Sequence, residues 1–154
     1  MEFREKRNLQ KSIHFYLETQ LNANFNNITT VLTFKQATKA SKPVVAVTLS
    51  GTETVFKEIG SNNIWDSHLV NIDIFAKSWG QAQDLADFIK NEIKGGCVYY
   101  IYSHTSGTYT SLESVADGRV KLVNWIRDEQ IDLGANMSES DQFRHTISIT
   151  VRKT

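Results

Sequence analysis

Residues that could do chemistry are scattered along this 154-residue chain rather than grouped. Its histidines fall one to a predicted element, and no two stand four residues apart on a helix, so a metal site would need ligands from distant segments. His145 belongs to an apolar strand face, which favours a hydrogen-bonded strand residue over a ligand. The sequence therefore predicts no metal and no other cofactor at the four histidines, His14, His68, His104 and His145.

Two other patterns resemble parts of catalytic motifs. Glu92-Ile93-Lys94, with Asp73 upstream, has the acidic and lysine residues of metal-dependent nucleases, but it ends a predicted helix instead of pointing from a strand into a cleft. Cys97 follows two glycines and has no identifiable base, which favours a buried strand thiol over a nucleophile. Neither a glycine-rich phosphate loop nor a Gly-x-Ser-x-Gly turn is present. We therefore expect a protein that is not an enzyme.

Tyrosine is concentrated in one part of the chain. Four of the five tyrosines lie within eleven positions, beside a segment rich in Ser, Thr and Gly at 103–114: Tyr99, Tyr100, Tyr102 and Tyr109. Tyrosine and tryptophan are common at interfaces because they bury a large area and keep a polar group. The alternative is that these tyrosines pack one face of a sheet. Tyr99 and Tyr100 would point to opposite faces, so at least one must be covered by a helix of this chain or by a second subunit.

Composition limits the class of protein further. Seventeen Lys and Arg balance seventeen Asp and Glu, which argues against a protein that grips nucleic acid by neutralising phosphates. One cysteine excludes an internal disulfide framework. The longest apolar runs are far short of the roughly 20 residues that cross a bilayer, and the charged start lacks the apolar block of a secretory signal. We expect one domain over residues 1–154, without a membrane partner, kept in the cytoplasm or assembled there into something larger.

Hydrophobic periodicity predicts the helices and strands. Apolar residues at helical spacing predict helices over 3–22 and 79–94, and the second begins with a capping box at Ser78 and ends at Gly95-Gly96. This pattern, with the strands between, predicts an α+β fold: a mainly antiparallel, mixed β-sheet packed against an N-terminal helix and a central helix. Strands are expected at 28–34, 43–49, 54–59, 69–76, 97–102, 119–127 and 143–152, turns at Ser50-Gly51 and Asp117-Gly118, a polar connection at 35–42 and an irregular segment at 129–141.

One strand and the helix after it carry a resemblance to a known family. The strand Leu69–Ala76 includes valine, isoleucine, aspartate, isoleucine, an aromatic residue and alanine, and a short cap leads from it into Gln81–Ile89. This pattern resembles the centre of the tail terminator, or tail-completion, proteins of long-tailed bacteriophages. The resemblance covers most of the chain in order; it is supported by the amphipathic first helix and by Lys42–Val45 and Phe143–Ile149, while 103–118 and 128–141 match nothing in the pattern.

The resemblance implies an α+β subunit of a hexameric ring. Such a ring caps the tail tube protein, ends tail polymerisation and docks onto the head connector and neck proteins, while DNA passes through its lumen without specific binding. It belongs to the virion, at the tail and neck, after assembly in the host cytoplasm. A ring needs two different complementary surfaces on each subunit, and exposed sheet edges and loops are natural material for both.

The aromatic and basic residues then become candidates for contacts between proteins. We expect subunit or tube contacts from Trp65, Tyr99, Tyr102 and Tyr109, and contacts to an acidic neighbour from Arg4, Lys6 and Arg7. Two alternatives stay open. One is another head–tail connector, neck or minor tail protein, and the other is a cytoplasmic binding module of unknown ligand.

Overall fold

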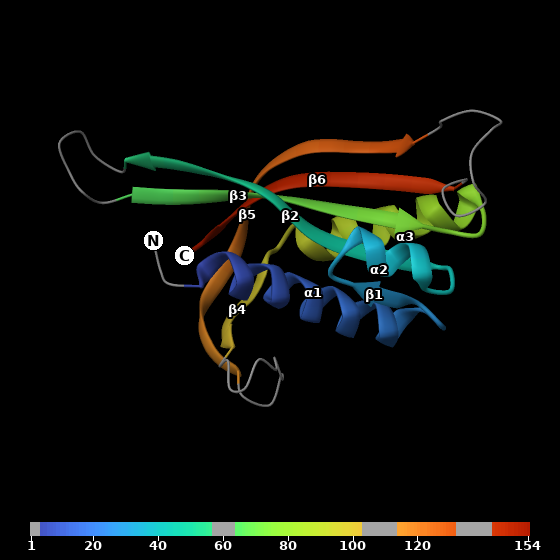
Figure 1. The fold of residues 1–154 in the computed structure, drawn as a ribbon, viewed down its shortest axis with the longest axis horizontal. Coiled ribbons are helices and arrows are strands. Elements are labelled where there is room, and N and C mark those ends of the chain that lie inside the picture. Colours follow the sequence, from blue (N-terminus) through green and yellow to red (C-terminus); the bar gives the residue numbers. More distant parts are fainter. Residues whose placement is uncertain (1–3, 57–63, 103–113, 132–142) are drawn as a thin grey trace.

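Six strands form one mixed sheet with helices packed on both of its faces (Figure 1). The computed structural model describes residues 4–56, 64–102, 114–131 and 143–154. The strand order is β1-β2-β3-β6-β5-β4; β1 and β2 are parallel and all other neighbours are antiparallel, which confirms the expected α+β class. The elements are α1 (Glu5–Asn24), β1 (Thr29–Val31), α2 (Phe34–Lys39), β2 (Val44–Phe56), β3 (Ile64–Phe75), α3 (Trp79–Ile93), β4 (Cys97–Tyr102), β5 (Ser114–Ile131) and β6 (Arg144–Lys153).

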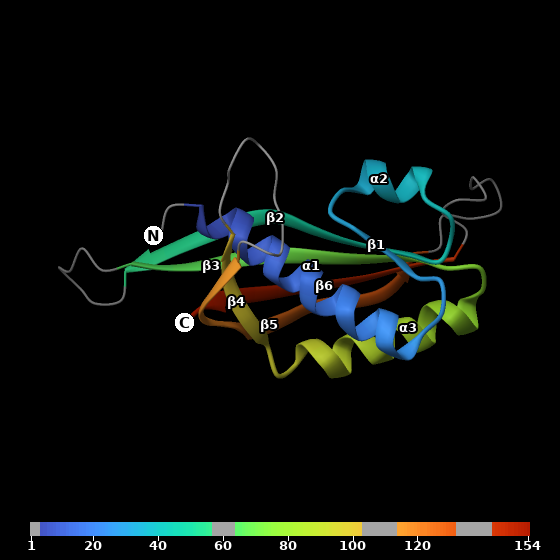
Figure 2. The ribbon, with the colours of Figure 1, turned by 90° about the horizontal axis from the view of Figure 1, so that it is seen from below.

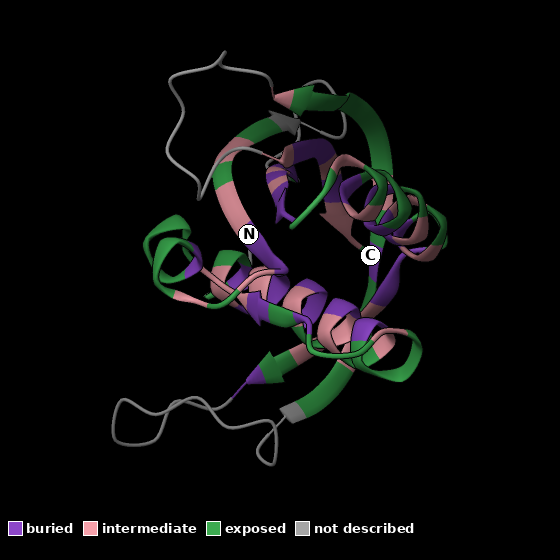
Figure 3. Cartoon of the chain, turned by 90° about the vertical axis from the view of Figure 1, so that its right-hand side faces the viewer, coloured by how far each residue is buried: buried purple, intermediate pink, exposed green. Residues whose placement is uncertain are grey.

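The main core lies between one face of the sheet and the helices α1 and α3. Each helix contributes an apolar stripe, and alternate residues of the central strands β3 and β6 meet both stripes. In Figure 3 these helices carry their buried residues on the side toward the sheet. The predicted stripes are therefore confirmed. The fully buried members include Leu9, Ile13, Leu17 and Leu21 of α1, Leu85 and Ile89 of α3, Val70, Ile72 and Ile74 of β3, and Ile147 and Ile149 of β6.

Helix α3 begins and ends as its sequence predicts. Ser78 Oγ accepts a hydrogen bond from the Gln81 amide at 3.2 Å, and the Gln81 side chain accepts one from the Lys77 amide at 2.8 Å. After the helix, Gly96 has φ +74°, and a Cβ there would collide with the carbonyl oxygen of Val120. Glycine thus allows the chain to turn directly from α3 into β4 beside β5.

The opposite face of the sheet is polar at its centre and covered at one end by α2. Asp73 accepts hydrogen bonds from Arg144 at 2.8 Å and from Thr146 at 2.7 Å. At the end near α2, the rings of Phe34 and Phe75 pack edge to face, with their centroids 5.4 Å apart. Asp73 therefore lies on the sheet face away from the main core.

Two predicted turns lie inside long strands, so those predictions were wrong. β2 runs through Ser50-Gly51, where its pairing with β3 shifts by one residue, and it therefore includes 54–56. β5 runs through Asp117-Gly118, where the register against β4 shifts and Gly118 has φ +89°. Glycine accommodates a β-bulge at both places instead of reversing the chain.

Two connections also differ from the prediction. Thr33 caps the short helix α2 by accepting a hydrogen bond from the Gln36 amide, so the start of the expected polar connection is helical and β1 is shorter than the predicted strand. β5 continues to Ile131, so the start of the segment expected to be irregular is strand.

Candidate assembly surfaces

Helix α1 covers the outer edge of β4 by bonding to its backbone. Ser12 Oγ accepts from the Tyr100 amide at 2.9 Å, and Asn8 Oδ1 accepts from the Tyr102 amide at 3.4 Å. Arg7 donates to the carbonyl of Tyr102 at 2.6 Å. Ser12 and Asn8 are 0% and 1% exposed. These polar side chains are buried because they satisfy backbone groups of an edge strand that, among the described residues, has no neighbouring strand on that side.

The same helix reaches the opposite edge of the sheet. Gln10 donates to the carbonyl oxygens of Leu32 at 3.0 Å and of Val47 at 2.9 Å, and His14 Nε2 lies 3.0 Å from the carbonyl oxygen of Thr30. Because β1 and β4 are the two ends of the strand order, the sheet curls until both ends meet α1 (Figure 2). From the sequence, we expect exposed sheet edges to serve as contact surfaces. The edges of β1 and β4 are instead occupied by α1.

Two aromatic residues expected at an interface lie inside the chain. Tyr99 is 0% exposed and Tyr102 is 3% exposed, and burial raises the pKa of Tyr102 to about 12. The ring of Tyr100 packs edge to face on Phe15 of α1, with centroids 6.1 Å apart, so a helix of this chain supplies cover for β4. Partner contacts of Tyr99 and Tyr102 stay predictions, although these side chains present almost no surface. Tyr109 lies outside the described residues.

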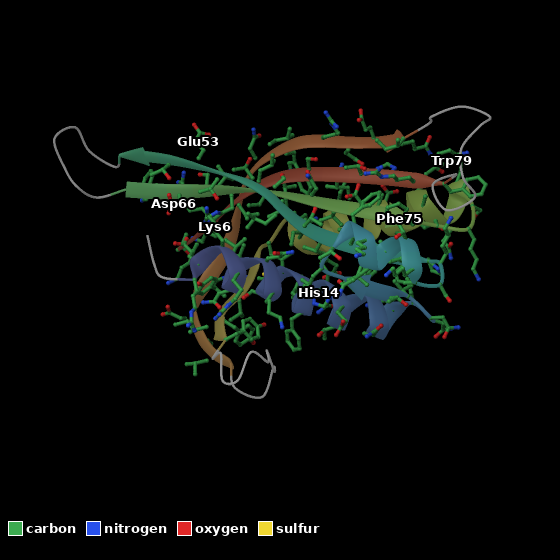
Figure 4. The ribbon with its side chains drawn as sticks, viewed as in Figure 1. Lys6, His14, Glu53, Asp66, Phe75 and Trp79 are labelled. Atoms are coloured by element: carbon green, nitrogen blue, oxygen red, sulfur yellow. The ribbon has the colours of Figure 1, made fainter. Side chains whose placement is uncertain are left out.

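Of the three basic residues at the start of α1, Arg7 is half-buried and the other two are on the surface. Arg7 contacts Asn8 Oδ1 at 3.0 Å as well as the Tyr102 carbonyl, which brings together two residues expected at an interface. Arg4 and Lys6 are exposed, and Figure 4 shows Lys6 at the start of α1. Contact of these three residues with an acidic neighbour stays a prediction.

Beyond the body of the sheet, β2 and β3 continue as a two-stranded ribbon that we name the hairpin arm, residues 51–56 and 64–67 (Figure 1). β1 pairs only with Val44–Ala46 of β2. Along the arm, the outer edge of β2 therefore has no strand partner among the described residues. A two-stranded ribbon on its own is only marginally stable in water, so contacts at the base of the arm matter.

The arm has a polar base and an exposed tip. At the base, the His68 ring lies 2.9 Å from Thr52 Oγ1 and 3.4 Å from a carboxylate oxygen of Glu5, and His68 is fully buried. Farther out, Trp65 is 44% exposed, and the guanidinium of Arg152 lies 4.4 Å from its ring centroid. Glu53, labelled in Figure 4, is exposed on the other strand. The arm thus presents an aromatic ring and a carboxylate.

Exposed apolar residues lie along β5, with Trp125 toward α3 and Ile126 on the opposite face of the sheet, where it lines a hollow with Glu53 and Ser67. We name three of them the β5 ridge: Val123, Trp125 and Ile126. They are 48%, 38% and 54% exposed. Val123 and Ile126 are bulge residues without a partner in the β5–β6 register. Because β4 pairs only with 114–120, the edge of β5 along 121–131 has no strand partner among the described residues. Beside an open strand edge, such exposed apolar side chains are candidates for contacts with another chain.

Charged groups hold Trp125 and Asp128 of β5 to helix α3. Lys90 Nζ lies 2.6 Å from Asp128 Oδ2 and 5.4 Å from the Trp125 ring centroid, and Asp128 Oδ1 lies 2.5 Å from His145 Nε2. Burial acts to raise the pKa of Asp128, but the hydrogen bonds from Lys90 and His145 outweigh it and lower the pKa below its ordinary value. The prediction that His145 is a hydrogen-bonded strand residue is confirmed.

Cys97 and Glu92, the residues considered for catalysis, are engaged in packing and hydrogen bonding within the fold. Cys97 is 2% exposed, and burial raises the pKa of its thiol to about 12, which keeps the sulfur protonated. Glu92 accepts a hydrogen bond from Tyr16 at 3.0 Å at the end of α3, where Ile93 lies in the core. Among the residues that the structure describes, no three His, Cys, Asp or Glu side chains gather as a metal site. Over the same ranges, no helix has the length and apolar character to span a membrane.

Comparison with known proteins gives a match at the level of fold. No known family model and no curated protein sequence matches the chain. The fold is similar to that of a chain in the solved structure of the virion of a native gene transfer agent particle, with a TM-score of 0.52 and 11% sequence identity. The similarity covers 99% of this chain and 98% of that chain.

Sequence reasoning missed the edge-binding residues of α1 and the β5 ridge. Asn8 and Ser12 stand four residues apart, a spacing that could have indicated a polar stripe on one side of the helix. The ridge had no such signal, because its two bulges interrupt the alternation by which a strand face is recognised.

Proposed function

We propose that this chain is a structural subunit of a phage-type virion and, within it, a tail terminator. Six copies would close into a ring that caps the tail tube, ends tail polymerisation and joins the tail to the head connector, with DNA passing through the lumen. The observation that carries the proposal is the similarity of fold to a virion chain over 99% of this chain. The family resemblance of Leu69–Ala76 and Gln81–Ile89 supports the terminator role.

The exposed surfaces suit ring closure. A ring uses a heterologous contact, in which two different patches on each subunit meet. The hairpin arm and the edge of β5 form such a pair, because β3 and β6 lie between β2 and β5 in the sheet and the open edges therefore face opposite ways. We propose Trp65 as a subunit or tube contact, with Arg4 and Lys6 toward an acidic neighbour.

Assembly of the purified chain tests this function. Light scattering after size-exclusion chromatography is expected to give a mass of six subunits, and negative-stain images are expected to show rings. When tail tubes are added, the rings should bind at tube ends and stop further growth. A chain that stays monomeric at high concentration and ignores tail tubes would contradict the proposal.

A further inference from the structure

Residues 51–56 of β2 and 127–131 of β5 each keep a regular open edge in the described part of the chain. Residues 51–56 of β2 pair without interruption with 64–69 of β3. Residues 127–131 of β5 pair without interruption with 144–148 of β6. On its outer side, each segment presents backbone N–H and C=O groups, which another strand can pair with.

These two segments extend toward opposite ends of the sheet, and only their near ends approach each other, where Glu53 and Ile126 line one hollow. The arm lies beyond the point where β3 pairs with the end of β6, at His68 and Val151, whereas 127–131 lies beside the start of β6. Figure 1 shows the arm at the left end and the end of β5 at the upper right. One copy therefore cannot pair its own two segments, but the arm of one copy can reach β5 of the next.

One pair of exposed side chains beside the two edges is of opposite charge: Glu53 on the arm and Arg127 on β5. Glu53 is exposed and forms no ion pair within the described residues. Arg127 is 55% exposed, and its contact with Glu129 at 3.3 Å is an exposed ion pair, a kind that contributes little. Glu53 pairs with Ser67, and Arg127 pairs with Ser148, so both side chains lie on the sheet face away from the main core.

We infer that copies of this chain join by strand addition: residues 51–53 in the hairpin arm of one copy pair antiparallel with 127–129 of the next, with Glu53 opposite Arg127. The inference rests on the proposed ring. Backbone hydrogen bonds supply affinity, and the charge pair selects the register. In this register residues 54–56 of the arm run beside 124–126, next to the exposed residues Trp125 and Ile126. The sheet then continues from subunit to subunit around the ring.

Charge reversal tests the contact. Glu53→Lys and Arg127→Glu each place like charges opposite one another in every interface, so each variant alone is expected to lose the ring peak in size-exclusion chromatography. Mixed in equal amounts, the two variants are expected to recover rings, because every interface in an alternating ring again holds opposite charges. The matched control is Asp84→Lys, which reverses an exposed acidic residue on α3 and should keep its rings.

Cross-linking supplies an independent readout. Glu53→Cys combined with Arg127→Cys should form a disulfide-linked ladder that ends at the ring number, since buried Cys97 does not compete. Rings that persist in both charge variants, or folded variants that fail to recover rings on mixing, overturn strand addition and leave the proposed function standing. A wild-type chain without rings, alone or on tail tubes, overturns both.

Discussion

At the scale of single residues, Asp128 joins three elements with one carboxylate. It lies on β5, bonds to Lys90 of α3 and contacts His145 of β6. Because these partners lower its pKa in the folded chain, folding favours the ionised form. The stabilisation is therefore complete above the ordinary aspartate pKa of about 3.9, and it is lost as the pH falls through the lower value of the folded state.

Asp128→Asn is therefore expected to lower stability in a pH-dependent way. At pH 7 the loss should be about 1 kcal/mol, the scale of a partly exposed ion pair, and the gap to wild type should narrow as the pH falls below about 4. Urea unfolding at several pH values measures both quantities. Asp84→Asn, on the exposed side of α3, serves as the control. An equal gap at all pH values would mean that the charge of Asp128 does not contribute.

At the scale of elements, α1 is the part that holds the curled sheet closed. Ser12→Ala removes the acceptor for the Tyr100 amide and is expected to cost about 1–3 kcal/mol, the penalty for an unsatisfied buried donor. Thr19→Ala is the matched control: both hydroxyls donate to the carbonyl four residues earlier, but Thr19 is exposed and accepts nothing from β4. Thermal unfolding compares the two. Equal melting temperatures would show that the edge contact does not stabilise the fold.

Elements with local signals could be predicted from the sequence, and elements decided by pairing could not. The cap, stripe and stop of α3 all lie within a few residues of the helix. Gly51 and Gly118 have the local signature of a turn, but neighbouring strands make each part of a bulge. The candidate surfaces divide in the same way. Trp65 stands out by residue type, whereas the role of Ser12 depends on a strand 88 residues away.

At the scale of the whole molecule, the exposure of a side chain predicts whether its replacement affects ring assembly or the stability of the fold. Trp65 is exposed on the arm, so Trp65→Ala should lower stability by less than about 1 kcal/mol and yet weaken ring formation. Tyr102 is buried, so Tyr102→Ala should lower stability by about 3 kcal/mol or more. Circular dichroism melts combined with light scattering distinguish the two effects. If Trp65→Ala forms rings as stable as those of the wild type, Trp65 does not contribute to the interface.

The closure of the sheet by α1 also sets an order of events during synthesis. The bonds from Arg7, Asn8 and Ser12 to β4 span 88 to 95 residues. On the ribosome, the first helix thus emerges long before its partner strand exists, and contacts so distant in sequence form slowly. We expect this docking to be a late step of maturation. Until α1 docks, the edge strands β1 and β4 of a newly made sheet are uncovered. Misassembly with other nascent chains then competes with correct folding.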